Sequence, residues 1–218
     1  MKPSVKRNIY LVDDHPMVRE RLAQLINHES DLQVCGEAAS APEALQGIEA
    51  AKPDLVVTDI ALKNSHGLEL IKNLSAINPQ LPILVLSMHE ESHFAERVLR
   101  AGAKGYITKE QATTKVLVAI RAVLAGQVYV SEQTVARLLN RTARGAKFGS
   151  SPLEVLADRE LEVFQMIGRG LNTREIASEL RISAKTVETY RLRIKEKLNL
   201  ETGAELVREA IRSHTDLG

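Results

Sequence analysis

The sequence predicts an α/β domain with a five-stranded, doubly wound parallel sheet, followed by a smaller all-α domain. Between residue 8 and about residue 125, five short apolar runs alternate with five amphipathic segments. Strict alternation of this kind is typical of a parallel sheet whose strands are joined by right-handed helical crossovers. Beyond residue 152 the patterns are helical, and no run resembles a strand.

Each predicted strand is a short run, and most are rich in Val, Ile and Leu. These runs lack the alternation of a strand with one wet face, as expected when helices cover both faces of a sheet. Apolar residues at three- and four-residue steps predict the helices between them, for example Val18, Leu22 and Ile26 in the first. The predicted strands are Ile9–Val12, Gln33–Glu37, Leu55–Thr58, Ile83–Leu86 and Gly105–Thr108.

A linker is predicted between the two domains. Ser131–Arg141 has the pattern of an amphipathic helix, with Val135, Leu138 and Leu139 as its apolar positions. The stretch Thr142–Pro152 then mixes Gly, Ser, Pro and basic residues without periodicity, which is typical of a flexible connection. We therefore expect a first domain over 1–128, a linker helix and flexible linker over 129–152, and a second domain over 153–218.

The composition favours an ordinary soluble protein. Of the 218 residues, 44% are hydrophobic and 26% are charged, which excludes disordered and fibrous classes. No apolar run approaches the roughly 18 residues of a membrane helix, and the start lacks a signal peptide, so we expect a cytoplasmic protein without membrane contact. A net charge of +1 means that any nucleic-acid binder must concentrate its positive charge locally. The single cysteine, Cys35, is expected to be a small core residue.

Polar side chains follow four of the predicted strands. Asp13 and Asp14 follow the first strand, Asp59 the third, Ser87 the fourth and Lys109 the fifth. The carboxyl ends of parallel strands meet at one edge of the sheet, so these side chains are expected to share one pocket. Three clustered carboxylates repel one another and need a cation, and a small hard dication such as Mg²⁺ suits oxygen ligands.

This arrangement predicts phosphoryl transfer to a carboxylate. Asp59 is the best nucleophile because its strand is central in the sheet. Asp13 and Asp14 would hold the metal, Lys109 would bind phosphate, and the Ser87 hydroxyl would bond a phosphate oxygen. Taken singly, an aspartate after a strand often caps a helix or forms a turn, and Asp14 could cap the helix that begins near Pro16. Four suitable residues at four strand ends favour the site.

These residues resemble the receiver domain of two-component response regulators, over about the first 125 residues. The resemblance lies in the acidic pair of LVDDH, the aspartate of VVTDI with Gly67 eight residues on, the serine of VLSMH and the lysine of GYITK. It implies the strand order 2-1-3-4-5 and Mg²⁺-dependent transfer of phosphate from a histidine kinase to Asp59. It also implies that the backbone carbonyl of Ala61 completes the metal shell. Tyr106 matches the aromatic residue that rotates when the hydroxyl shifts toward phosphate, although it could equally be an ordinary half-buried strand tyrosine.

Two positions depart from that family pattern. Lys63 stands where many receivers have proline four residues after the aspartate, and Glu110 stands where many have proline after the lysine. A cis peptide bond after Lys109 would be costly without proline. Neither change touches a proposed site residue, but both leave the lifetime of the phosphate undetermined.

The second domain contains the pattern of a helix-turn-helix. Asp158 is predicted to cap a helix whose apolar face ends before Gly168. Asn172 and Glu175 have the spacing of a capping box at the start of a short helix. Ser183 is predicted to cap a longer helix, Ala184–Leu198, after a tight turn at Arg181–Ser183.

The longer helix divides by face. Val187, Tyr190, Ile194 and Leu198 recur at helical steps and should face the core. A second stripe is flanked by Arg191 and Arg193, so the helix is locally basic and suits a DNA major groove. A solvated helix in a bundle is the alternative. The residues of the second stripe are Lys185, Glu188, Thr189 and Leu192.

Leu156–Leu200 resembles the LuxR-type helix-turn-helix domain of the NarL/FixJ regulators, a four-helix domain. The resemblance lies in DRELEVFQMIGRG, NTREIASEL, ISAKTVETYRLRIKEKL and the closing helix. It implies that the second stripe faces the bases and that the final helix, Thr202–Ser213, pairs two copies of the chain on DNA. The residues predicted to contact the DNA backbone are Thr173, Arg174, Arg191, Arg193 and Lys197.

The two resemblances together imply a transcription regulator controlled by phosphorylation, with DNA, a histidine kinase and a second copy of the chain as partners. RNA polymerase is a further candidate partner. Beyond phosphotransfer to itself and loss of that phosphate, we expect no enzymatic activity. One alternative is a phosphatase with Asp13 as nucleophile, although such enzymes usually separate the two aspartates by one residue. Another is a regulator or interaction module that acts without phosphorylation.

Overall fold

The computed structural model describes residues 6–62, 67–88, 91–143, 155–180 and 182–215. The chain divides into two compact units, Met1–Leu139 and Asn140–Gly218. All five predicted strands are confirmed, with ends that differ by at most two residues. The strands are β1 Arg7–Val12, β2 Leu32–Ala38, β3 Leu55–Thr58, β4 Ile83–Ser87 and β5 Gly105–Thr108.

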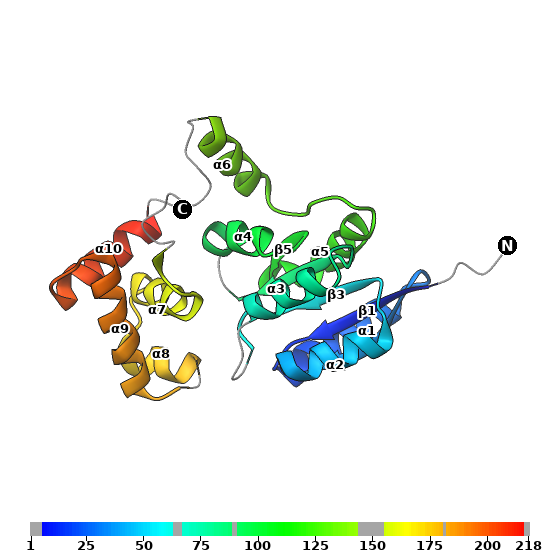
Figure 1. Cartoon of the computed structure of the whole chain (residues 1–218), viewed down its shortest axis with the longest axis horizontal. Helices are drawn as coiled ribbons and strands as arrows, with labels where there is room; N and C mark the ends of the chain where they lie inside the picture. The colour runs from blue at the N-terminus through cyan, green and yellow to red at the C-terminus, as the bar shows by residue number, and fades with distance from the viewer. Residues whose placement is uncertain (1–5, 63–66, 89–90, 144–154, 181, 216–218) are drawn as a thin grey trace. The chain divides into compact units, whose positions relative to one another are not determined.

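The strands form one parallel sheet in the order β2-β1-β3-β4-β5, which confirms the expected topology. The central strands β1 and β3 are visible between the helices in Figure 1. The register pairs Val12 with Thr58 and Ser87 with Thr108. Since these four residues are the last of their strands, the residues that follow β1, β3 and β5 come out at one edge of the sheet.

Helices cover both faces of this sheet. One face packs against α1 (Pro16–Asn27) and α5 (Lys109–Leu124) in an aliphatic core that includes Leu11, Leu86 and Ile120. The other face carries Tyr10, whose ring fits against α2 because Gly47 has no side chain there. The remaining helices of the sheet domain are α2 Ala41–Ala51, α3 Gly67–Ile77 and α4 Glu91–Arg100.

The segment after α5 is anchored to the first unit. Tyr129 pairs with the edge strand β5: the Tyr106 N–H donates to the Tyr129 carbonyl at 2.8 Å, and the Tyr129 N–H donates to the Lys104 carbonyl at 2.9 Å. The Ser131 N–H donates to Oε1 of Glu91, in the first turn of α4, at 2.6 Å. Helix α6 (Glu132–Ala143) follows, close to the predicted linker helix. Most of the predicted flexible linker, Thr142–Pro152, lies outside the described residues.

The second unit is helical, as predicted. The side chains of Asn172 and Ser183 accept backbone N–H groups at the starts of α8 and α9, which confirms both caps. The prediction that Asp158 is an N-cap was wrong. Asp158 is the first helical residue, Ala157 is the N-cap, and Oε2 of Glu160 accepts the Ala157 N–H at 2.7 Å. The helices are α7 Asp158–Gly168, α8 Thr173–Glu179, α9 Ala184–Leu198 and α10 Gly203–Thr215.

Two further features concern the burial of Cys35 and the character of the helices. Cys35 is half-buried rather than a core residue, because it lies on β2 at the edge of the sheet, and its Sγ lies 3.5 Å from the Ile9 carbonyl oxygen. Burial raises the pKa of this thiol above its ordinary value. Across the described residues, no helix is both long enough and apolar enough to span a bilayer.

Candidate functional site

The predicted carboxylate pocket forms at the carboxyl ends of β1, β3 and β5. Asp59 follows β3 and is only 2% exposed, and its backbone N–H donates to the Val12 carbonyl at 2.8 Å. The Lys109 ammonium lies 2.6 Å from Oδ2 of Asp59 and 2.6 Å from Oδ2 of Asp13. The structure therefore brings the predicted nucleophile, one predicted metal ligand and the predicted phosphate-binding lysine into direct contact.

Burial and charge oppose one another at Asp59. Removal from water raises the pKa of its carboxyl, the Lys109 ammonium lowers it, and the Asp13 carboxylate raises it again, with a net increase above the ordinary value. Burial lowers the pKa of Lys109, but the Asp59 and Asp13 carboxylates raise it more. Lys109 therefore stays charged at neutral pH and provides the positive charge that the two buried acids require.

One residue of this cluster, His15, was missed in the sequence. Its Nδ1 lies 2.8 Å from Oδ1 of Asp14 and 3.1 Å from Oδ1 of Asp13. One ligand atom from each of Asp13, Asp14, His15 and Asp59 falls within 4.8 Å of all the others. Three carboxylates at this spacing fit a small hard dication. The signal was available, because a histidine directly after two aspartates reaches the same edge of the sheet.

The loop that follows Asp59 supports the carboxylate. The Ala61 N–H donates to Oδ1 of Asp59 at 3.1 Å. The Gly67 N–H donates to the Ile60 carbonyl at 3.0 Å, so the backbone at 67 lies directly against the backbone at 59–60. A Cβ at Gly67 would lie 2.3 Å from the Asp59 carbonyl oxygen, which explains why glycine is needed there. The departure at Lys63 lies outside the described residues.

Ser87 and Tyr106, the two predicted switch residues, are buried. Ser87 ends β4 and is 0% exposed, and Tyr106 lies in β5 and is 1% exposed. The register pairs Tyr106 with Val85, two residues before Ser87. Tyr106 is thus more deeply buried than the half-buried strand tyrosine that was the alternative. The rearrangement of these two side chains on phosphorylation stays a prediction.

The departure at Glu110 is accommodated by α5. This helix begins at Lys109, and the Thr108 hydroxyl caps it by accepting the Gln111 N–H at 3.3 Å. Glu110 therefore lies in the first turn, where a negative charge stabilises a helix. No peptide bond in the described residues is cis, so proline is not required after Lys109.

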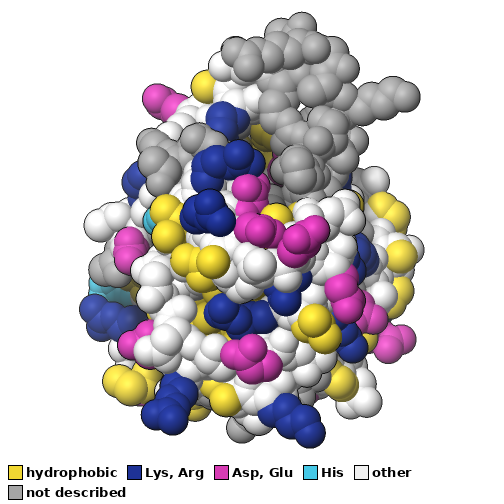
Figure 2. Space-filling model, turned by 90° about the vertical axis from the view of Figure 1, so that its left-hand side faces the viewer, with side chains coloured by type: hydrophobic (Ala, Val, Ile, Leu, Met, Phe, Trp, Pro, Cys, Tyr) yellow, Lys and Arg dark blue, Asp and Glu magenta, His cyan; other side chains and the backbone are white. Residues whose placement is uncertain are grey.

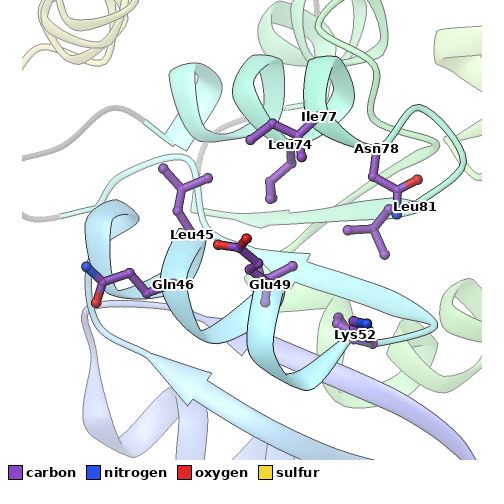
Figure 3. Close-up of a pocket in the computed structure, with 10 residues that line it drawn as sticks. Leu45, Gln46, Glu49, Lys52, Leu74, Ile77, Asn78 and Leu81 are labelled. Atoms are coloured by element: carbon purple, nitrogen blue, oxygen red, sulfur yellow. The ribbon is translucent and has the colours of Figure 1, made fainter.

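A separate cavity of about 570 Å³ lies between α2 and α3. Figure 3 shows Leu45 and Glu49 of α2 opposite Leu74 and Ile77 of α3. The residues that line this cavity are mostly apolar, and none belongs to the carboxylate cluster. The cavity is therefore distinct from the site around Asp59.

The faces of α9 are confirmed. Of the predicted core face, Val187 and Ile194 are 0% exposed and Tyr190 and Leu198 are half-buried, whereas Leu192 on the second stripe is 53% exposed. The other three stripe residues, Lys185, Glu188 and Thr189, are also exposed. On the face drawn in Figure 2, Lys and Arg side chains are interspersed with Asp and Glu. The exposed stripe itself offers a cation, an acid, a hydroxyl and an apolar side chain, a mixture that suits base edges.

Three of the residues predicted to contact the DNA backbone have partners within the second unit: Thr173, Lys197, and Arg191, whose Nε lies 3.8 Å from Oε2 of Glu188. The Thr173 hydroxyl donates to Oε1 of Glu188 at 2.6 Å. The Lys197 ammonium lies 2.7 Å from Oε2 of Glu160, a residue that is 3% exposed. Lys197 therefore pairs with a buried acid of α7. Arg174 and Arg193 are exposed and Arg191 is half-buried, and their contacts with DNA stay predictions.

Two protein families match this chain. The response regulator receiver domain matches residues 9–121, and the bacterial regulatory proteins of the luxR family match residues 154–210. The first match covers the sheet and the carboxylate cluster, and the second covers α7, α8, α9 and most of α10.

Relatives match over nearly the whole length. The chain is 40% identical to the transcriptional activator protein ExaE of Pseudomonas putida over 205 residues, which cover 94% of this chain and 96% of that protein. It is also similar to RcsB from Salmonella enterica serovar Typhimurium bound to promoter rprA in the presence of phosphomimetic BeF3⁻, with 26% identity, a TM-score of 0.59, and coverage of 93% and 97%. A structure of two RcsB dimers bound to two parallel DNAs matches with 25% identity, a TM-score of 0.57, and coverage of 93% and 97%.

Proposed function

The chain belongs to the response regulators that join a receiver domain to a LuxR-type DNA-binding domain, and we propose that phosphorylation of Asp59 by a histidine kinase controls its binding to DNA. The observation that carries this proposal is the position of the Lys109 ammonium, 2.6 Å from both Asp59 and Asp13. An aspartate that is buried, paired with a lysine and placed at the carboxyl end of a central strand is equipped to receive a phosphoryl group.

The chain's own residues account for the transfer step. A carboxylate oxygen of Asp59 attacks the phosphorus of a phosphohistidine, the P–N bond breaks, and an acyl phosphate forms while the imidazole nitrogen regains a proton. Lys109 neutralises charge on the phosphoryl oxygens, and the Ala61 N–H holds Oδ1 of Asp59. Asp13, Asp14, Asp59 and the Ala61 carbonyl are the proposed ligands of Mg²⁺. When bound, the ion would neutralise further charge on the transferred group.

Two features argue against the alternatives. Lys109 pairs with both aspartates, but Asp59 follows the central strand β3, whereas Asp13 also touches His15, so Asp13 is better suited to hold a cation than to attack. A regulator that works without phosphorylation would not need three acids and a lysine in one buried cluster, because such a cluster costs stability. Loss of phosphate from Asp59 would then be the only other reaction of this chain.

A connected path leads from Asp59 toward the linker. Ser87 and Tyr106 lie on β4 and β5, α4 follows β4, and Glu91 in α4 binds the Ser131 N–H just before α6. We propose that phosphorylation shifts Ser87 and Tyr106, that α4 and β5 move with them, and that this change reaches α6. The response would either release the second unit or promote pairing of two chains.

The DNA-bound form is proposed to be a dimer, with RNA polymerase as a further candidate partner. RcsB, a relative over nearly the full length, has been solved bound to promoter rprA and, in another structure, as two dimers bound to two parallel DNAs. Two linked copies of α9, the helix proposed to enter the major groove, would raise the affinity for DNA, because the second contact is effectively intramolecular. Because its proposed partner is chromosomal DNA, we place the regulator in the bacterial cytoplasm.

A mobility-shift assay tests this function. The full-length chain is incubated with Mg²⁺ and acetyl phosphate, and its affinity for a selected duplex is compared with that of the untreated chain. Asp59→Asn should neither incorporate phosphate nor respond. Glu49→Gln, which removes an exposed carboxylate from α2, is the control and should behave like the parent. A response of Asp59→Asn equal to that of the parent would exclude the proposed switch, and ester hydrolysis abolished by Asp13→Asn would favour a phosphatase.

A further inference from the structure

A hydrogen bond joins the two helices of the helix-turn-helix at the exposed stripe. Thr173 is the first residue of α8, and its hydroxyl donates to Oε1 of Glu188, on α9, at 2.6 Å. The Glu188 side chain is 60% exposed, and its second oxygen lies 3.8 Å from Nε of Arg191. A glutamate on the recognition helix is thus held from a different helix.

This bond is difficult to reconcile with a phosphate contact by Thr173. A hydroxyl has one proton to donate, and here the Glu188 carboxylate accepts it. A phosphate oxygen at the same hydroxyl would have to displace that carboxylate and would be repelled by its charge. The predicted role of Thr173 in binding the DNA backbone is therefore better replaced by a role that acts through Glu188.

The chemistry of a held carboxylate limits which base it can bind. An ionised carboxylate only accepts hydrogen bonds, so it needs an amino group on a base edge. In the major groove guanine offers the acceptors O6 and N7, and thymine offers the acceptor O4 beside a methyl group. Adenine has an amino group, but the acceptor N7 lies next to it. Cytosine offers the N4 amino group without an N7 acceptor beside it.

We propose that Glu188 reads a cytosine in each DNA half-site and that Thr173 is the positioning residue that holds the Glu188 carboxylate for this contact. The inference rests on the proposed function, because it requires α9 to lie in the major groove. One carboxylate oxygen accepts the Thr173 hydroxyl, and the other, 3.8 Å from Nε of Arg191, would accept the cytosine amino group. Without the hydroxyl, an exposed glutamate would sample several rotamers, and its preference for cytosine would weaken.

The test measures base preference rather than affinity alone. The full-length chain, treated with acetyl phosphate, selects duplexes from a random library, and dissociation constants are then measured with each of the four base pairs at each selected position. We expect one position per half-site where loss of cytosine weakens binding by about 5- to 150-fold. Glu188→Gln should shift the preference at that position toward adenine, since glutamine pairs with the N6 and N7 edge of adenine.

Three further variants separate positioning from backbone contact. Thr173→Val should reduce discrimination at the cytosine position several-fold and leave the other positions and the salt dependence unchanged. Thr173→Ser, which keeps the hydroxyl, should restore the parent profile. Ser178→Ala, which removes an exposed hydroxyl from the same helix, is the matched control and should have no effect.

Uniform weakening of all duplexes by Thr173→Val, with a smaller salt dependence, would overturn the proposal and restore Thr173 as a phosphate contact. An unchanged base preference in Glu188→Gln would also overturn it. If the parent chain enriches no sequence at all, the proposed DNA-binding function fails, and this inference fails with it. A parent that selects a site while Glu188→Gln keeps the same preference refutes only the role of Glu188.

Discussion

The ion pairs of this chain differ in burial, and burial decides how much each contributes to the stability of the fold. Lys109 and Asp59 have side chains that are 9% and 1% exposed, so the loss of Lys109 would leave two buried carboxylates without a counter-charge. The pair of Arg121 and Asp31 is 42% and 43% exposed. Its contribution is therefore small, although the guanidinium donates to both oxygens of Asp31 at 2.7 and 2.9 Å.

The exposed pair makes a pH-dependent prediction. The hydrogen bond from Arg121 lowers the pKa of Asp31 below its ordinary value of 3.8. A carboxyl with a lowered pKa in the folded state adds stability above its unfolded value, and this stability is lost as the pH falls through the folded value. Arg121→Gln should therefore lower receiver stability by about 0.5–1 kcal/mol from pH 5 to 8, and the deficit should shrink below pH 4.

Calorimetry of the parent and variant at pH 7, 5 and 3 measures this difference. Lys115→Gln, which removes an exposed cation from the same helix, is the control. An equal deficit for Arg121→Gln at all three pH values would show that the pair contributes through packing and not through charge.

At the scale of elements, α4 and α6 are joined by one buried carboxylate. Glu91 is 8% exposed, although a glutamate is almost never buried without a partner. The partner is the Ser131 N–H, in the segment that also pairs with β5 through Tyr129. The start of the linker is therefore attached to α4, which follows Ser87 in the chain, and to β5, which contains Tyr106. A movement of α4 or β5 should therefore move the start of the linker.

Glu91→Ala tests this attachment. The variant leaves the Ser131 N–H without its acceptor, which should speed hydrogen exchange at residues 131–135 and cost about 1–3 kcal/mol locally. Phosphate incorporation should be unchanged, whereas the gain in DNA affinity on phosphorylation should fall. Glu132→Ala, one residue beyond Ser131 and exposed, is the control. Parent-like exchange and a full response in Glu91→Ala would show that the linker is not coupled through this residue.

At the scale of the whole molecule, charge is balanced globally and concentrated locally. The chain carries 29 basic and 28 acidic residues, so it has no general attraction to DNA. Some of the cations near α9 are engaged within the fold, as Lys197 is with Glu160. Arg174 and Arg193 are exposed, and they are the cations that we propose to neutralise DNA phosphates.

DNA affinity should therefore fall steeply as salt rises, because binding at phosphates releases counterions. Arg174→Gln should reduce the slope of log affinity against log salt by about one per bound subunit while leaving base preference intact. Titrations from low to high salt measure the slope, and Lys104→Gln, an exposed lysine of the first unit, should not change it. A flat salt response of the parent would contradict phosphate binding altogether.

Local patterns were enough to predict most of the architecture. The five strands and the caps at Asn172 and Ser183 depend on periodicity and on contacts within a few residues, which a sequence displays directly. The order of the strands was predicted from the resemblance to receiver domains. The carboxylate site followed from one further rule, that parallel strands present their carboxyl ends at the same edge. The error at Asp158 was a shift of one position, because Asp158 and Ala157 stand next to each other at the helix start.

Only packing could reveal the contacts between residues far apart in the chain. Glu91 and Ser131 are separated by 40 residues, Thr173 and Glu188 by 15, and Glu160 and Lys197 by 37. No short-range pattern records these pairs, because each depends on how two elements are placed against each other. Local periodicity therefore specifies the helices, the strands and the chemistry at their ends. Tertiary structure decides which charged and polar groups remain available to a phosphate or a base.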